Sequence, residues 1–280
     1  MYFAGVDIGS TMTKVVIVDK DGGICAHIIG PTGAEHRRLA NRVMEEALKQ
    51  SGLCFNEMEY VVATGYGRFN VPFADHKLTE LTCHTRGVAS LFPGVKTAID
   101  IGGQDAKGLK INNGKLVNFV MNDKCAAGTG RFLEVIADTL GIKVEDLGKV
   151  SSQSNQRVGI SNICTIFAQQ EVVARLSDAV SVEDILAGLH DAIASRVITM
   201  VQRLKIEPDV VLTGGVAMNT GVVKAVKEKL ECEVFVPEQP LLSGALGAAL
   251  LAKEYVLDKL VKEEPIIRKE RQLAETTFFG

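Results

Sequence analysis

Two short segments of the chain combine aspartate, glycine, hydroxyl and lysine residues in the manner of a phosphate-binding turn. The first is DIGSTMTK (7–14) and the second is DIGGQDAK (100–107). Glycine lets the backbone approach a phosphate closely, and the amides and hydroxyls of such a turn direct partial positive charge at it. The aspartate that opens each turn offers the hard oxygen ligands that suit hydrated Mg²⁺. The two segments therefore predict a site for phosphate groups and a magnesium ion.

Within these turns, Asp7 and Asp100 are the candidate magnesium ligands and catalytic carboxylates. The neutral amide of Gln104 could hold an attacking water in line with a terminal phosphate, because positioning is the main protein contribution to phosphoryl transfer. Alternatively, Gln104 and Asp105 only close the turn. The residues expected to contact phosphate are Gly9, Ser10, Thr11, Met12, Thr13, Lys14, Gly102, Gly103 and Gln104.

Two cysteines are also placed to do chemistry. Cys125 opens CAAGTGRFLE and Cys164 precedes TIFAQQEV, so each lies at the N-terminal edge of a predicted amphipathic helix. Free N–H groups there lower a thiol pKa and stabilise a thiolate-bound cluster. The thiols are 164 − 125 = 39 residues apart without a C-x-x-C companion, so one chain supplies at most half of a four-thiolate site. Two identical subunits on a twofold axis would complete it, whereas a buried structural role is the commoner fate of cysteine.

The elements that position the turns are arranged as a repeat. Each turn lies between two apolar strands, and a second short turn follows. Aligning Asp7 with Asp100 gives an offset of 100 − 7 = 93 residues, which matches both D-I-G triplets and pairs Lys14 with Lys107. Two copies of one strand–turn–strand unit indicate a duplicated architecture.

Hydrophobic spacing predicts the remaining elements and three regions. The regions are an N-terminal lobe over 1–95, a C-terminal lobe over 96–258 and a peripheral tail over 259–280. Helices are predicted over 35–51, 130–140, 166–176, 182–204, 222–230 and 243–256, and further strands over 60–64, 209–219 and 232–237.

Composition excludes several classes of protein. The net charge is −3 with dispersed basic residues and only 5% aromatic residues, which disfavours a nucleic-acid partner. The N-terminus lacks the pattern of a signal peptide, and the longest apolar run, 241–252, is too short to span a membrane. We therefore expect a cytoplasmic protein without a membrane partner, whose six cysteines stay reduced.

The two phosphate turns, with a third glycine pair after the buried run VVLT, resemble those of actin, sugar kinases and chaperone ATPases. The resemblance implies an α/β fold of duplicated ribonuclease-H-like lobes that binds ATP or ADP with Mg²⁺. It also implies that a glycine turn carries the adenosine, here through Gly214, Gly215, Val216 and Asn219.

A narrower resemblance is carried by GVDIGSTMTK, ATGYGR, IDIGGQDAK, NDKCAAGTGRFLE, ICTIFAQQEV, LTGGVAMN and SGALGAAL. Together these segments are similar to the BadF/BadG/BcrA/BcrD ATPase family. The family resemblance implies a homodimer with one [4Fe–4S] cluster held between the subunits by Cys125 and Cys164. It further implies an ATP-hydrolysing electron donor to a partner iron–sulfur enzyme, such as a 2-hydroxyacyl-CoA dehydratase, a benzoyl-CoA reductase or a double-cubane cluster protein. A reduced ferredoxin or flavodoxin would supply the electron.

Two other functions fit the same fold. A small-molecule kinase would need a carboxylate base, for which Asp105 is a candidate, and a nucleotide-gated assembly protein would use ATP only to control shape. Glu80 and His84 are expected to form a local surface contact at helical spacing. No role is predicted for Cys25, Cys54, Cys83 or Cys232.

Overall fold

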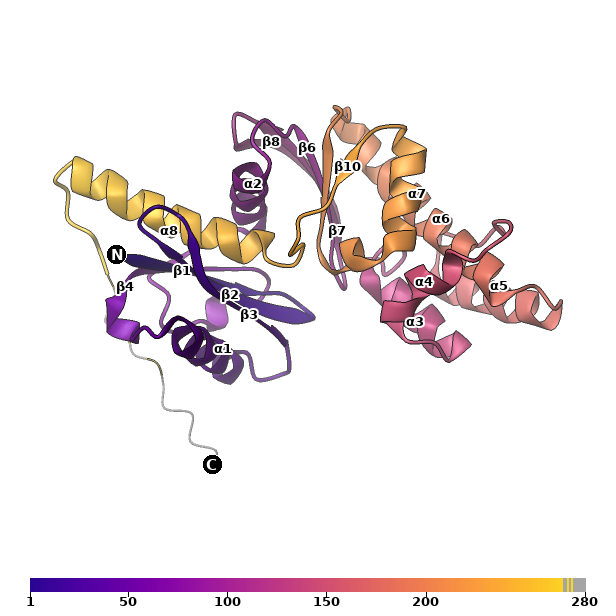
Figure 1. Ribbon diagram of the computed structural model, residues 1–280, viewed down its shortest axis with the longest axis horizontal. Helices are drawn as coiled ribbons and strands as arrows, with labels where there is room; N and C mark the ends of the chain where they lie inside the picture. Colours follow the sequence, from indigo (N-terminus) through magenta and orange to yellow (C-terminus); the bar gives the residue numbers. More distant parts are fainter. Residues whose placement is uncertain (269–270, 272, 274–280) are drawn as a thin grey trace, which may run out of the picture. The chain divides into compact units, whose positions relative to one another are not determined.

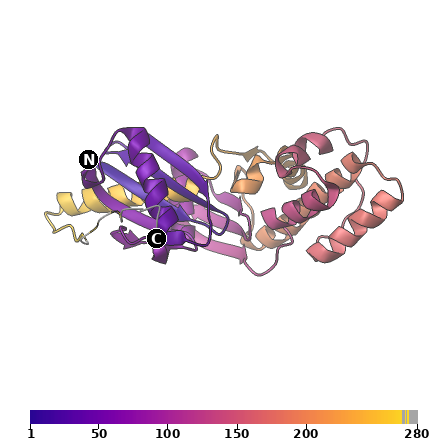
Figure 2. The same ribbon diagram turned by 90° about the horizontal axis from the view of Figure 1, so that it is seen from below.

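The computed structural model describes residues 1–268, 271 and 273, which form two compact units. Unit 1 comprises Met1–Pro93 and Leu241–Gly280, and unit 2 comprises Gly94–Pro240 (Figures 1 and 2). No helix within these described residues is long and apolar enough to cross a bilayer.

Unit 1 is built on a five-stranded sheet in the order β3-β2-β1-β4-β5. The first three strands are antiparallel neighbours, and β4 and β5 run parallel to β1. The strands are β1 (Tyr2–Ile8), β2 (Met12–Asp19), β3 (Ile24–Pro31), β4 (Met58–Thr64) and β5 (His76–Lys77). Alternate side chains of β1 and β2 enter two separate cores. One core is covered by α1 (His36–Ser51), and the other by α2 (Glu80–Leu91) and α8 (Ser243–Val261).

Helix α8 packs in unit 1 because glycines bring its backbone close to its neighbours. A Cβ at Gly5 of β1 would lie 2.0 Å from the Ala245 carbonyl oxygen, and one at Gly247 would lie 1.7 Å from the Cys83 carbonyl oxygen. No side chain fits at these crossings, so the small residues of α8 seat it directly on β1 and α2. This corrects the boundary predicted from the sequence, which assigns residues 241–258 to the C-terminal lobe.

Unit 2 repeats the same topology in a sheet of order β10-β9-β6-β7-β8. Its strands are β6 (Thr97–Ile101), β7 (Ala106–Asn112), β8 (Lys115–Asn122), β9 (Val210–Thr213) and β10 (Val234–Phe235). Strands β6, β7 and β8 are antiparallel neighbours, and β9 and β10 run parallel to β6, as β4 and β5 do to β1. The two units therefore have the duplicated fold that the offset of the two turns predicts.

The helices of unit 2 pack into one core with the strands β6 and β9. They are α3 (Gly130–Leu140), α4 (Leu147–Ser151), α5 (Thr165–Ser177), α6 (Val182–Val201) and α7 (Thr220–Leu230). The predicted helices correspond to α3, α5, α6 and α7, whereas the short α4 was not predicted. The predicted strands 209–219 and 232–237 are wrong in length, because β9 ends at Thr213 and β10 has two residues.

The described part of the tail 259–280 is not merely peripheral, because it contacts unit 1. Arg271 forms an ion pair with the buried Asp75, 2.8 Å between Nη1 and Oδ2. Arg268 pairs with Glu59 of β4, and Leu273 packs against the core beneath α1. The rest of the predicted tail, 269–270, 272 and 274–280, lies outside the described residues.

Candidate functional site: two aspartate–lysine turns and two cysteine segments

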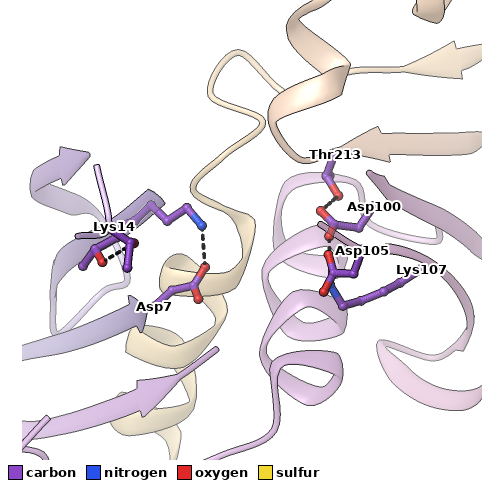
Figure 3. Close-up of polar contacts among 8 residues, drawn as sticks. Asp7, Lys14, Asp100, Asp105, Lys107 and Thr213 are labelled. Atoms are coloured by element: carbon purple, nitrogen blue, oxygen red, sulfur yellow. Dashed lines mark hydrogen bonds and ion pairs between the residues drawn. The ribbon is translucent and has the colours of Figure 1, made fainter. Parts of the chain in front are cut away.

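The first turn connects β1 to β2 and holds an ion pair at its base. Asp7 lies opposite Lys14 in the register of the two strands, and Lys14 Nζ lies 3.1 Å from Asp7 Oδ2 (Figure 3). The turn is closed by a hydrogen bond from Gly9 N to the Met12 carbonyl oxygen. Ser10 and Thr11 at its tip are exposed, whereas the Thr13 hydroxyl is buried and bonded to Thr32.

The second turn connects β6 to β7 and repeats this arrangement with one more carboxylate. Asp100 lies opposite Lys107 in the register of the strands, with Nζ 3.5 Å from Oδ2. Lys107 Nζ also lies 2.7 Å from Asp105 Oδ2, and the Thr213 hydroxyl donates to Asp100 Oδ1 over 2.9 Å (Figure 3). Gln104 is exposed at the tip, while Asp105 is held by Lys107.

The repeat also includes the ends of the parallel strands, which sequence reasoning missed. In the register, Asp7 lies beside Thr64 and Asp100 beside Thr213, and each threonine precedes a glycine with positive φ. A Cβ at Gly65 would lie 2.3 Å from Asp7 Oδ1, and one at Gly214 would lie 3.0 Å from Asp100 Oδ1. The signal was present as Thr-Gly at the end of both apolar runs, TGYG and TGGV.

The predicted adenosine segment is a turn and a 3₁₀ helix rather than a strand. Gly214 adopts φ +86°, and residues 215–218 form the 3₁₀ helix. Asn219 then caps α7, its side-chain oxygen accepting from Gly221 N and Val222 N. We call residues 214–219 the nucleotide turn. A groove of about 1010 Å³ lies beside it, lined by Ala217, Thr220, Val223, Lys224, Lys227, Glu228, Glu231, Cys232, Glu233 and Val236.

Unit 2 brings the two predicted cluster cysteines into neighbouring segments. Cys164 is the N-cap residue of α5, and Cys125 lies five residues before α3 begins at Gly130. The Cys125 Sγ lies 4.0 Å from the carbonyl oxygen of Ile163, the residue before Cys164. Both thiols are partly exposed. Over the described part of the chain, no group of three or more His, Cys, Asp or Glu side chains is arranged to hold a metal ion.

Cys125 is held by the end of β8. The Asn122 amide donates to the Cys125 carbonyl oxygen over 2.8 Å and to that of Ala127 over 3.3 Å, and its oxygen accepts from Cys125 N. This asparagine was not singled out from the sequence, although N-D-K-C places it three residues before the thiol.

The cysteine segment is also tied to the second phosphate turn. Gly130 N donates to the Gly102 carbonyl oxygen and Arg131 N to that of Gly103, both over 2.8 Å. These are N–H groups of the first turn of α3, which have no partner within the helix. The phosphate turn therefore caps the helix that follows Cys125.

The remaining candidates are distributed differently. Cys83 is buried, and burial raises the pKa of its thiol to about 12. Cys25 and Cys54 are exposed, and Cys232 is partly exposed. His84 is buried on α2 rather than at the surface, and a Cβ on Gly244 would lie 3.0 Å from its Nε2 and 2.9 Å from Asp7 Oδ2.

Comparison with known proteins decides between the resemblances. The model of the BadF/BadG/BcrA/BcrD ATPase family matches residues 4–252. The chain belongs to this family. Among relatives of the family, the chain is 48% identical over 255 residues to the 2-hydroxyisocaproyl-CoA dehydratase activator of Clostridioides difficile, covering 90% of this chain and 95% of the relative.

Two solved structures of family ATPases match over almost their whole length. One is component A of the (R)-2-hydroxyglutaryl-CoA dehydratase of Acidaminococcus fermentans, with a TM-score of 0.89, 43% identity, and coverage of 92% of this chain and 99% of that chain. The other is the activator of the 2-hydroxyisocaproyl-CoA dehydratase from Clostridium difficile with bound ADPNP, with a TM-score of 0.88, 45% identity, and coverage of 96% and 100%.

More distant structures share the fold alone. A glucokinase of the ROK family from Streptomyces griseus matches with a TM-score of 0.58 at 14% identity, covering 91% of this chain and all of that chain. The family ATPase therefore has the actin-like fold predicted from its two phosphate turns.

Proposed function

We propose that this ATPase is the activator of a partner iron–sulfur enzyme. It would hydrolyse ATP to ADP and phosphate and pass one low-potential electron from a [4Fe–4S] cluster to the partner. A reduced ferredoxin or flavodoxin would replace the electron. The observation that carries the proposal is the meeting of the segments of Cys125 and Cys164, 39 residues apart in the sequence, in a unit that also holds a phosphate turn.

The relatives support a dehydratase as the partner. The most similar of them are named as activators of 2-hydroxyacyl-CoA dehydratases, and a more distant family member is one of the subunits of a benzoyl-CoA reductase. We therefore infer an acceptor that reduces or dehydrates an acyl-CoA.

The cysteines fit half of a shared cluster. Two partly exposed thiols on one chain leave two ligands to be supplied, which a second copy on a twofold axis would provide. Cys164 caps α5, where the free N–H groups of a helix start favour a thiolate. The apolar side chains of Ile163, Ile166 and Phe167 beside it are more than half exposed, as expected of a surface that a second copy would cover. When bound, the cluster would supply the one-electron carrier.

The phosphate turns fit a nucleotide with magnesium. Asp7 and Asp100 each present a carboxylate already balanced by one lysine, so a divalent cation would compete with Lys14 and Lys107 for the same oxygens. The freed ammonium groups would then bind phosphate oxygens. The exposed amide of Gln104 would hold the attacking water.

Contacts within unit 2 offer a way for nucleotide to act on the thiols. Because Gly102 and Gly103 cap α3 through their carbonyl oxygens, a phosphate that shifts this turn would also shift the start of α3. Cys125 lies on the segment between that helix start and the Asn122 clamp. Nucleotide would thereby change the setting of Cys125.

The decisive experiment is anaerobic purification followed by iron and sulfide analysis and electron paramagnetic resonance after reduction. We expect a dimer with four iron atoms per two chains, and loss of the signal in Cys125→Ala and in Cys164→Ala. Cys232→Ala is the matched control, because Cys232 is a free thiol of similar partial exposure in the same unit. An iron-free protein whose ATP hydrolysis is unaffected by either substitution would instead favour the small-molecule kinase.

A further inference from the structure

His190 is a buried histidine in the middle of α6 that no predicted role accounts for. Its side chain is 2% exposed, and burial lowers its pKa from 6.5 to about 4, so the ring is neutral at neutral pH. A buried polar group of this kind normally has a bonding partner that justifies its place. For His190 that partner belongs to the nucleotide turn.

The hydrogen bonds of Asn219 assign the roles of the two imidazole nitrogens. Its side-chain oxygen accepts from Gly221 N over 2.9 Å and from Val222 N over 3.1 Å, which fixes the orientation of the amide. The Asn219 Nδ2 therefore faces His190 Nε2, 3.3 Å away, and must be the donor. His190 Nε2 is the acceptor and its proton is on Nδ1, which has no hydrogen-bond partner among the described residues.

Close backbone packing leaves this pair no room to rearrange. A Cβ at Gly221 would lie 2.1 Å from His190 Nδ1, and one at Gly148 of α4 would lie 3.1 Å from Asn219 Oδ1 and 2.7 Å from Thr220 Oγ1. Asn219 is thus held between α4 and α6, and only glycines permit the contact.

The same helix contacts both cysteine segments. The Asp184 carboxylate accepts from the backbone N–H groups of residues 155 and 156, and a Cβ at Gly188 would lie 1.7 Å from the carbonyl oxygen of residue 158. These residues lead to Cys164. On the other side, a Cβ at Gly128, three residues after Cys125, would lie 2.9 Å from Arg196 Cγ. Helix α6 therefore touches the nucleotide turn and the segments of both thiols.

We propose that His190 is a positioning residue that fixes the nucleotide turn to α6 by accepting the amide of Asn219. The inference rests on the proposed function only in that the turn holds the nucleotide. His190 itself lies behind the turn, so it acts through Asn219 and not on the substrate.

The test compares His190→Gln with His190→Leu in the full chain, by titration calorimetry with ADP and by thermal unfolding. Glutamine keeps a neutral acceptor, whereas leucine keeps bulk and leaves the Asn219 amide without one. We expect His190→Leu to weaken ADP binding about tenfold, equivalent to about 1.4 kcal/mol, and His190→Gln to remain within about threefold of wild type. Asn219→Asp, which keeps the cap of α7 but loses the donated amide hydrogen, should weaken binding in the same way.

A general loss of stability is controlled by Val172→Ala, a cavity in the same core on α5 that touches no residue of the nucleotide turn. It should lower the melting temperature and leave ADP affinity unchanged. The proposal is overturned if His190→Leu binds ADP like wild type, if His190→Gln loses as much as His190→Leu, or if affinity follows melting temperature across all variants. Should His190→Leu not fold, Asn219→Asp decides by the same criterion. A wild-type chain that binds no ADP would overturn the proposed function as well.

Discussion

Lys107 compensates two carboxylates while being only 3% exposed. Breaking a buried ion pair by removing one partner costs about 3 kcal/mol, because the remaining charge stays buried without compensation. We therefore predict that Lys107→Met lowers the free energy of unfolding by about this amount, measured by denaturant titration. Magnesium should reduce the loss, since it would bind the same oxygens of Asp100 and Asp105.

The matched control is Lys20→Met, which removes an ion pair between two exposed side chains. Such pairs contribute about 0–1 kcal/mol. If Lys107→Met were as stable as Lys20→Met, the ion pairs seen at the second turn would not describe its charge balance.

His190 also makes stability depend on pH. Its pKa is about 4 in the folded chain against 6.5 ordinarily, so below pH 6.5 the unfolded chain binds a proton that the folded chain excludes. Stability should be constant above pH 6.5 and fall as the pH is lowered toward 4, by at most about 3 kcal/mol. Asp184 on the same helix, whose pKa is lowered by backbone hydrogen bonds, loses its contribution at lower pH, below 3.8.

The measurement is the free energy of unfolding at pH 7.5, 6, 5 and 4.5 for wild type and His190→Gln. Glutamine does not titrate, so the slope below pH 6.5 should be smaller in the variant. Equal slopes in the two proteins would mean that His190 is protonated in the folded chain.

At the scale of elements, the start of α3 connects a phosphate turn to a thiol. A methyl group at Gly130 would lie 3.2 Å from both the Gly102 carbonyl oxygen and Gly103 Cα, so Gly130→Ala should push the helix start away from the turn. In the cluster-free protein, we predict that a saturating ATP analogue changes the alkylation rate of Cys125 by about threefold, roughly the effect of one hydrogen bond. Gly130→Ala should abolish this response.

Gly159→Ala is the control, because Gly159 lies in the same unit and a Cβ there would meet nothing within 4 Å. Alkylation of Cys125 is followed by mass spectrometry, with analogue binding to each variant measured separately. A response retained in Gly130→Ala at full occupancy would exclude the helix start as the connection.

At the scale of the whole molecule, the sequence allowed the duplicated fold to be predicted because Asp, Gly and Lys recur at one register in two strand pairs. It did not reveal that α8 belongs to unit 1, because apolar spacing gives a helix but not its partner. That choice depends on backbone contacts at Gly5 and Gly247. Likewise, Asn219 could be read as a nucleotide residue, but His190, 29 residues earlier, became its partner only through packing.

The discontinuous unit 1 leads to a prediction about fragments. Unit 2, residues 94–240, has its own continuous core, so this fragment should unfold cooperatively by itself. Residues 1–93 lack α8, which covers one face of their sheet, and should be aggregated or poorly structured. Joining them to 241–273 through a flexible linker of about ten glycine and serine residues should restore a cooperative unit, since α8 crosses α2 near the junction. Circular dichroism with thermal melting of the three fragments is the measurement, and cooperative melting of 1–93 alone would contradict the assignment of α8 to the first unit.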